Sequence, residues 1–447
     1  MLSKIVSLSF VCIIIICTFT GCKGQETVTS ECFEETVTTV VNSNASDKDD
    51  VPTDSSTTNK PVSSSKKSES SDKIKSENSP SAEDEKSIYT YCTDKILEKS
   101  VLYKGDTTRL ASKIKSALAD KNHKTKIACL GDSITAGASV GMTEGHYANK
   151  FLSYWKKYIS NSVELKIKGS GATTSYFGAH WADEAILADK PDIIFIEYVN
   201  DMPGEQHTVN CMDSLIRKCL SLDNKPAVIL LEMSYNGTRN AQASHSKPAK
   251  AYGVPMISWQ NGLSLSLIQG DIKWSDVAGD EVHPNKRGHH MLGEMMWYFV
   301  DSVIPSASNA KEPSAFNTPA VTDDVYKNCK ILNRTNLTPA SVGNFTEVIS
   351  DSGLSNGWGT TKGGEISFKV TAKRIGIAIL RSNTIPNGKA EIYVDGTLVV
   401  TLNGKHSFTY IEARELKVFK TLEEHTVTVK VLDGENNDFQ VLGLFVS

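Results

Sequence analysis

The sequence LGDSITAG at residues 130–137 decides the fold, because it places a serine between an apolar strand and a helical stretch. The apolar run 127–130 predicts the strand. Residues at the carboxyl end of a parallel strand face the crevice in which α/β sheets bind ligands. Gly131 and Gly137 permit a tight turn in which backbone N–H groups near Ser133 stay free. The stretch predicts an exposed serine at a sheet edge, although Gly-Asp-Ser is also a common turn tripeptide.

The sequence on both sides of this serine alternates apolar runs with amphipathic stretches over residues 126–305, which is typical of an α/β sheet. The runs are nearly continuous, as expected of parallel strands covered on both faces. We expect about five parallel strands and the helices that connect them. The strands are predicted at 127–130, 163–167, 193–198, 227–231 and 254–257, and the helices at 147–159, 181–188, 209–220, 240–252 and 285–303.

The first 85 residues have a different composition. Lys4 and the apolar stretch 5–19 predict a signal peptide, and Phe-Thr-Gly-Cys at 19–22 resembles the bacterial lipobox, whose cysteine is lipidated. We therefore expect a lipoprotein signal peptide at 1–22 and a membrane anchor at Cys22, with ordinary signal cleavage as the alternative. Residues 23–85, rich in Ser, Thr and acidic side chains, predict a disordered tether. The expected location is extracytoplasmic, on a bacterial cell membrane or secreted.

The C-terminal part of the chain has a third pattern. After a linker predicted at 307–322, polar and apolar residues alternate, as in Glu365-Ile366-Ser367-Phe368-Lys369-Val370. Turn signals occur at Asp395-Gly396, Asn403-Gly404 and Asp433-Gly434. These features predict an α/β domain at 86–306 followed by an all-β, sandwich-like domain at 323–447.

Charge and cysteine spacing exclude several classes of function. A formal net charge of −4 gives no sign of the basic surface that nucleic-acid binding needs. The six cysteines that remain after signal removal and lipidation of Cys22 show no metal-site spacing, and the Ser-His-Asp chemistry described below needs neither a metal nor an organic cofactor. Cys211 and Cys219 lie eight residues apart in a predicted helix. That spacing corresponds to about 12 Å, too far for a disulfide, so both are predicted to be packing residues.

A second chemical signal lies near the end of the α/β part, where Asp280 stands three residues before His283. This spacing lets the carboxylate reach the imidazole from the same loop. In Ser-His-Asp chemistry the histidine takes the serine proton and returns it to the leaving group, while the acid fixes the tautomer. Asp280, His283 and Ser133 are therefore the predicted catalytic residues. Pro284 favours a helix start by itself, so a histidine beside it can be incidental.

Four blocks, in this order along the chain, resemble those of the SGNH (GDSL-like) hydrolase superfamily. Residues 131–135 match the first block and 280–284 the fourth. The third, normally Gly-x-Asn-Asp, reads Tyr198-Val199-Asn200-Asp201, so a tyrosine replaces the glycine. The second falls at 169–175, where Gly171 is preferred and Gly169 is the alternative.

This resemblance implies a flavodoxin-like three-layer sandwich, the SGNH hydrolase fold, over about residues 100–305. It also implies a nucleophile at Ser133 and an oxyanion hole formed by the N–H groups of Ser133 and Gly171 and the side chain of Asn200. Tyr198 puts the shape of the pocket wall in doubt. The expected packing or surface residues are His180, Trp181, Glu232, Trp274, His289 and His290, and GDTTRL at 105–110 resembles the lead-in of some carbohydrate-active members.

The β-rich part resembles the jelly-roll or galactose-binding-like modules that accompany some carbohydrate esterases. Such a module either binds glycan or covers one side of the catalytic cleft. The favoured interpretation is a carboxylic ester hydrolase, specifically a carbohydrate acetylesterase acting on an acylated polysaccharide or oligosaccharide through an acyl-enzyme on Ser133. A lipase or thioesterase and a sugar O-acyltransferase are alternatives with the same chemistry. A catalytically silent glycan-binding surface lipoprotein is the alternative of another class.

Overall fold

The computed structural model describes residues 88–350, 353–384, 388–434 and 437–447. The predicted signal peptide, the anchor at Cys22 and the whole tether at 23–85 are placed before residue 88, outside these ranges. Among the helices of the described ranges, none has both the length and the apolar character needed to cross a bilayer.

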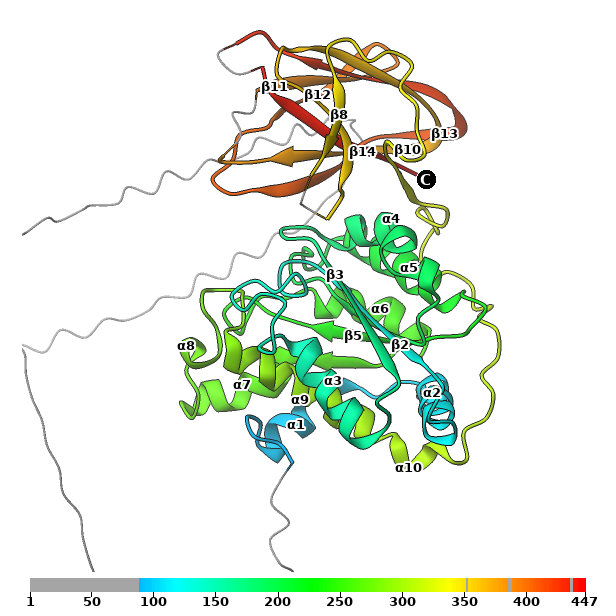
Figure 1. Ribbon diagram of the computed structural model, residues 1–447, viewed down its shortest axis with the longest axis vertical. Helices are drawn as coiled ribbons and strands as arrows, with labels where there is room; N and C mark the ends of the chain where they lie inside the picture. The colour runs from blue at the N-terminus through cyan, green and yellow to red at the C-terminus, as the bar shows by residue number, and fades with distance from the viewer. Residues whose placement is uncertain (1–87, 351–352, 385–387, 435–436) are drawn as a thin grey trace, which may run out of the picture. The chain divides into compact units, whose positions relative to one another are not determined.

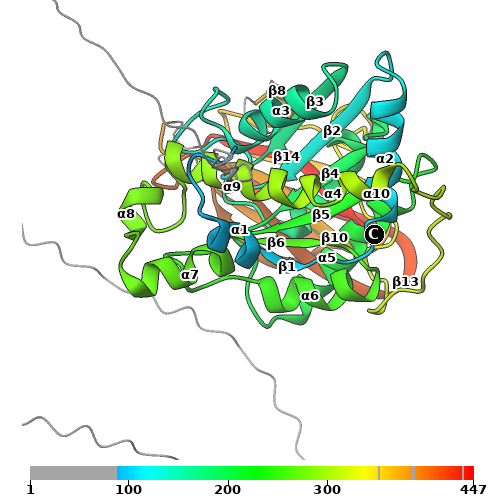
Figure 2. The same cartoon turned by 90° about the horizontal axis from the view of Figure 1, so that it is seen from below.

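The α/β part is built on a six-stranded sheet with the order β1-β6-β5-β4-β2-β3, and Figure 2 shows the strands side by side in this order. The five parallel strands predicted from the sequence are confirmed. The edge strand β1 is antiparallel to β6 and was not predicted, because three residues carry no recognisable alternation. The strands are β1 (Val101–Tyr103), β2 (Thr125–Gly131), β3 (Val163–Gly169), β4 (Ile193–Glu197), β5 (Ala227–Glu232) and β6 (Met256–Ser258).

Helices cover both faces of this sheet, and Figure 1 shows α4 and α5 on one side and α3 and α9 on the other. Three layers follow, as predicted. One face carries α1 (Asp94–Ser100), α2 (Thr108–Ala119), α3 (Tyr147–Tyr158), α7 (Trp259–Gln269), α8 (Trp274–Val277), α9 (Lys286–Asp301) and α10 (Ile304–Ala307). The other face carries α4 (Ser175–Ala185), the 3-10 turn η1 (Leu187–Asp189), α5 (Gln206–Leu220) and α6 (Gln242–Ala251).

Helix α4 begins at Ser175, six residues before the predicted start at 181. Its N-terminus is capped from a distance, because the backbone N–H of Ser175 donates to the Asp201 carboxylate at 2.8 Å. A helix start normally needs an acceptor for its free N–H groups, and sequence reasoning looks for that acceptor next to the helix. Here the acceptor comes from the loop after β4, so local sequence could not indicate it.

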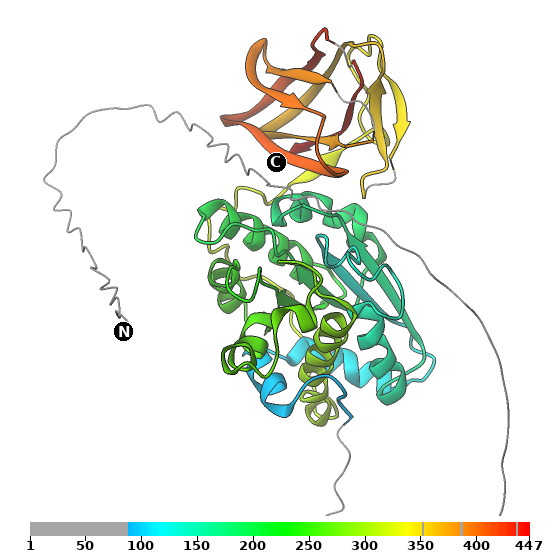
Figure 3. The same ribbon diagram turned by 90° about the vertical axis from the view of Figure 1, so that its left-hand side faces the viewer.

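The C-terminal part is all-antiparallel, as predicted, with strand order β12-β11-β13-β10-β14-β9-β8 and β7 paired with β14. Bulges between Ala372 and Arg374 and between Ile375 and Gly376 interrupt the long β10–β13 pairing, and bulges bend strands. Figure 3 shows the strands curving around a common interior. The strands are β7 (Lys330–Leu332), β8 (Thr346–Ile349), β9 (Asn356–Thr360), β10 (Gly364–Arg381), β11 (Lys389–Val394), β12 (Thr397–Asn403), β13 (Tyr410–Val431) and β14 (Phe439–Val446).

One hydrophobic cluster joins the β-rich part to the α/β part. Phe445 of β14 packs edge-on against Tyr176 and Phe177 of α4. Cys211 and Cys219 lie in the same cluster as buried free thiols, which confirms their assignment as packing residues. The outer face of α4 and α5 is therefore covered by protein.

Two glycines near the turn around Ser133 differ in how closely they are packed: Gly169, which ends β3, and Gly171, in the loop that follows. A Cβ added at Gly169 would lie 2.1 Å from the Ala136 nitrogen, whereas one added at Gly171 would meet only the Ser133 Cβ, at 3.8 Å. Gly169→Ala should therefore destabilise the fold by about 1–3 kcal/mol through overpacking. Gly171→Ala should change stability far less. Urea unfolding of the two variants checks this, and equal losses would contradict the geometry.

Candidate active site

The structure brings together the three side chains predicted to act in catalysis. Ser133 lies in the turn after β2, and its Oγ is 2.9 Å from Nε2 of His283. Nδ1 of the same imidazole is 2.7 Å from a carboxylate oxygen of Asp280. Ser133 and His283 are separated by 150 positions, so the fold creates the contact. Both side chains are partly exposed, and solvent or a substrate can reach the serine.

Backbone contacts hold Asp280 in place. Its Oδ1 accepts the N–H groups of Val282 and His283 at 2.8 and 2.7 Å, and its carbonyl accepts the indole N–H of Trp274 at 2.7 Å. Partial burial opposes ionisation, but the hydrogen bonds from His283 and Val282 outweigh it and lower the pKa of Asp280 below its usual value. An ionised Asp280 accepts a hydrogen bond from the Nδ1–H group, so the free lone pair on Nε2 faces Ser133.

Three donors surround the space beside Ser133. Among the described residues, none accepts a hydrogen bond from the backbone N–H of Ser133 or Gly171. Gly171 approaches Ser133, whereas Gly169 packs under Ala136, and Gly171 stays the predicted oxyanion donor. The Asn200 amide Nδ2 donates to Asp132 at 3.0 Å and to the Thr173 carbonyl at 3.3 Å. Both hydrogen bonds fix the orientation of the Asn200 amide.

Hydrogen bonds hold Asn200 through both its side chain and its backbone. Its Oδ1 accepts the hydroxyl of Tyr235, and its backbone N–H donates to Asp132 at 3.1 Å. Asp132 is fully buried beside a second buried carboxyl, Glu197, which accepts the Thr135 hydroxyl at 2.9 Å. Burial raises the pKa of both carboxyls, and the charge of Glu197 raises the pKa of Asp132 further. Asp132 holds Asn200 through hydrogen bonds from its backbone N–H and its side-chain amide.

Sequence reasoning missed a buried group directly behind Asn200. His245 of α6 is 2.9 Å from Asp201 through Nε2 and 3.0 Å from Glu232 through Nδ1. Burial lowers the histidine's pKa, but the charge of Glu232 and hydrogen bonds to both carboxylates outweigh it and raise the pKa to about 10. Glu232 was expected to be packing or surface. No local signal marks His245, because its partners come from the ends of β4 and β5.

Two of the weak candidates are buried histidines, and a third supports the catalytic loop. His180 and His289 are buried, and desolvation lowers the pKa of each to about 3. Trp274 supports the Asp280 loop. The ring of Tyr198 lies against Gly178 of α4 and belongs to the core cluster on that face of the sheet.

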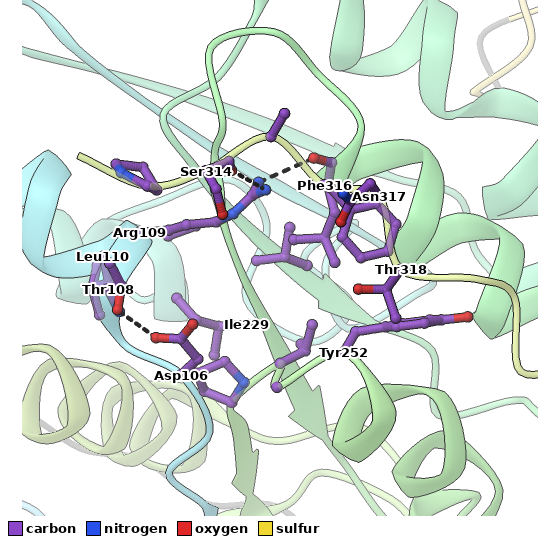
Figure 4. Close-up of a pocket in the computed structure, with 18 residues that line it drawn as sticks. Asp106, Thr108, Arg109, Leu110, Ile229, Tyr252, Ser314, Phe316, Asn317 and Thr318 are labelled. Atoms are coloured by element: carbon purple, nitrogen blue, oxygen red, sulfur yellow. Dashed lines mark hydrogen bonds between the residues drawn. The ribbon is translucent and has the colours of Figure 1, made fainter. Parts of the chain in front are cut away.

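Side chains of the stretch at 105–110 form structural hydrogen bonds, at the edge of the sheet opposite Ser133. Figure 4 shows a hollow lined there by Asp106, Arg109 and Tyr252, beside the first residues of β5. Asp106 accepts the Thr108 N–H at the start of α2, and Arg109 donates to the carbonyls of Leu220, Pro226 and Ser314. No cluster of three metal-ligating side chains occurs among the residues that the structure describes.

Comparisons with known proteins concern the fold of the chain. Residues 129–291 match the model of the GDSL-like Lipase/Acylhydrolase family. A two-domain esterase active on acetylated mannans, crystallised with mannopentaose, is similar at 26% identity with a TM-score of 0.72, over 78% of this chain and 97% of that one. A second structure of such an esterase gives 27% identity and a TM-score of 0.72, over 78% and 98%. No curated protein matches.

Asp280→Asn should lower kcat by up to about 10⁴-fold, because an amide can donate to Nδ1 and turn a protonated Nε2 toward Ser133. Asp276→Asn is the matched control, since Asp276 accepts only the Lys273 N–H of the same region, at 2.9 Å. Steady-state rates on an activated ester would measure both. Similar rates for the two variants would show that Asp280 does not orient His283.

The raised pKa of His245 predicts a pH-dependent stability. Since the folded-state pKa of about 10 exceeds the ordinary 6.5, the stabilisation is fully present below pH 6.5 and is lost as pH rises through about 10. The difference in unfolding free energy between the wild type and His245→Gln should shrink over that window. For His180→Gln it should stay constant there, because the pKa of His180 is lowered to about 3. Urea unfolding at several pH values measures both, and a constant difference for His245→Gln would contradict the assignment.

Proposed function

We propose that this protein is a serine esterase that removes acyl groups, chiefly O-acetyl groups, from carbohydrates. The observation that carries the proposal is the chain of contacts from Ser133 to His283 and on to Asp280, at 2.9 and 2.7 Å, beside two free backbone N–H groups. These are the nucleophile, the base, the orienting acid and the oxyanion donors that acyl transfer needs.

The reaction follows from these positions. Nε2 of His283 takes the proton of Ser133 as Oγ attacks the ester carbonyl carbon. The tetrahedral oxyanion accepts hydrogen bonds from the N–H groups of Ser133 and Gly171 and from Asn200. Collapse breaks the carbon–oxygen bond, and His283 gives its proton to the departing sugar oxygen, which leaves as a hydroxyl. Water, deprotonated by His283, then attacks the acyl carbon, the bond to Ser133 Oγ breaks as His283 returns the proton to Oγ, and acetate leaves.

A carbohydrate substrate is supported by the similar solved structures. The similar two-domain esterases act on acetylated mannans, and the likeness covers 78% of this chain, more than its α/β part alone. The β-rich part also reaches the loop after β3 that carries Gly171, because a Cβ at Gly353 would lie 3.0 Å from the Ser170 hydroxyl. This contact favours the role in which the β-rich part borders one side of the substrate path. The boundaries given above for the domains and the lipid anchor at Cys22 stay predictions.

The full chain should release p-nitrophenol from the acetate ester and lose this activity sharply as the acyl chain lengthens. It should also release acetate from acetylated mannan oligosaccharides. Ser133→Ala should abolish both activities while its thermal unfolding stays unchanged. Spectrophotometry and an acetate assay provide the measurements.

The other outcomes identify the alternatives. A long-chain optimum would favour a lipase or thioesterase, and transfer of acetyl to an added sugar would favour an acyltransferase. Retention on glycan that is unchanged by Ser133→Ala, without any ester turnover, would replace the enzyme with a glycan-binding protein.

A further inference from the structure

A buried ionic group lies next to the loop that carries Asn200, and its side chains take no part in the reaction described above. Asp201, His245 and Glu232 have exposed fractions of 2%, 3% and 3%. Both imidazole nitrogens face carboxylates, at 2.9 Å and 3.0 Å. Two carboxylate acceptors require two N–H donors, and only the imidazolium has two. The group is a carboxylate–imidazolium–carboxylate triad with one net negative charge.

Such a group is unusual as a source of stability. Removing charges from water costs several kcal/mol per ion, and apolar side chains of similar volume often stabilise a fold equally well. The triad cannot act as a second nucleophilic site, because its nitrogens are both occupied and a reagent cannot reach them. Any influence of the triad on catalysis therefore comes from fixing the positions of the chain segments that carry Asp201, Glu232 and His245.

That backbone also carries Asn200, the predicted oxyanion donor, and Tyr235, whose hydroxyl orients the Asn200 amide. Asp201 directly follows Asn200, and Glu232 ends β5 three residues before Tyr235, whose hydroxyl donates to Asn200 Oδ1. His245 joins the two loops by binding one carboxylate from each. The other oxygen of Asp201 caps α4 at Ser175, so the Asn200 loop is tied to two helices.

We propose that His245 is a positioning residue for the oxyanion hole, which acts by locking the Asn200 loop and the Tyr235 loop together. This inference rests on the proposed esterase function. When the triad is intact, the Asn200 amide is fixed before substrate arrives, and its hydrogen bond strengthens as the carbonyl oxygen becomes an oxyanion. Without His245, Asp201 and Glu232 repel one another across the gap, and both loops shift.

The proposal predicts an effect on the transition state and little effect on substrate binding. Loss of one oxyanion donor costs about 100- to 1000-fold in kcat, and a displaced donor should cost less. His245→Gln should therefore lower kcat about 10- to 100-fold with KM within about twofold. The inhibition constant of a phenylboronic acid, which forms a tetrahedral adduct on serine, should rise in parallel.

His180→Gln is the matched control, because His180 is equally buried at 3% and contacts the Tyr176 carbonyl on α4, away from Asn200. It should lower the melting temperature without changing kcat or KM. If His245→Gln does not fold, Glu232→Gln gives the same test, because it keeps the side-chain shape and removes one charge. A kcat within twofold of wild type for the folded variant would overturn the proposal. Activity that persists in Ser133→Ala would instead overturn the esterase function.

Discussion

The register between three parallel strands is the constraint on which the site depends. Gly131 at the end of β2 pairs with Gly169 at the end of β3 and with Glu197 at the end of β4. Ser133, Gly171 and Asn200 follow these residues by two, two and three positions, so all three reach the same edge of the sheet. A slip of one residue in either pair would move a donor by about 3.3 Å and separate it from the serine. The loop that carries His283 completes the site from the far end of the domain.

Buried polar groups beneath the turn explain how this register becomes a fixed site. Unpaired polar groups are costly away from water, and Asp132 and Glu197 each collect donors from two segments of the chain. Asp132 joins the serine turn to the Asn200 loop, and Glu197 joins β4 to Thr135. The triad centred on His245 adds α6 to the same network. The loops are thus arranged before substrate binds, which is the condition for electrostatic stabilisation of a developing oxyanion.

Sequence reasoning found what local patterns and order along the chain encode. Apolar runs placed the five parallel strands, and the spacing of Asp280 and His283 predicted a contact that the structure reproduces at 2.7 Å. It could not find interactions whose partners are brought together only by folding. The distant cap that starts α4, the position of Tyr198 against Gly178, and His245 between two loops are of this kind. In each case the deciding atom comes from an element far away in the sequence.

The most direct test of the account is covalent labelling of the full chain with an alkyl fluorophosphonate, which forms a phosphoryl adduct only with an activated nucleophile. Peptide mass spectrometry should find a single adduct on Ser133, and labelling should slow greatly in His283→Ala, which lacks the base 2.9 Å away. An adduct on another residue, or an equal labelling rate in His283→Ala, would contradict the claim that Ser133 is a nucleophile activated by His283.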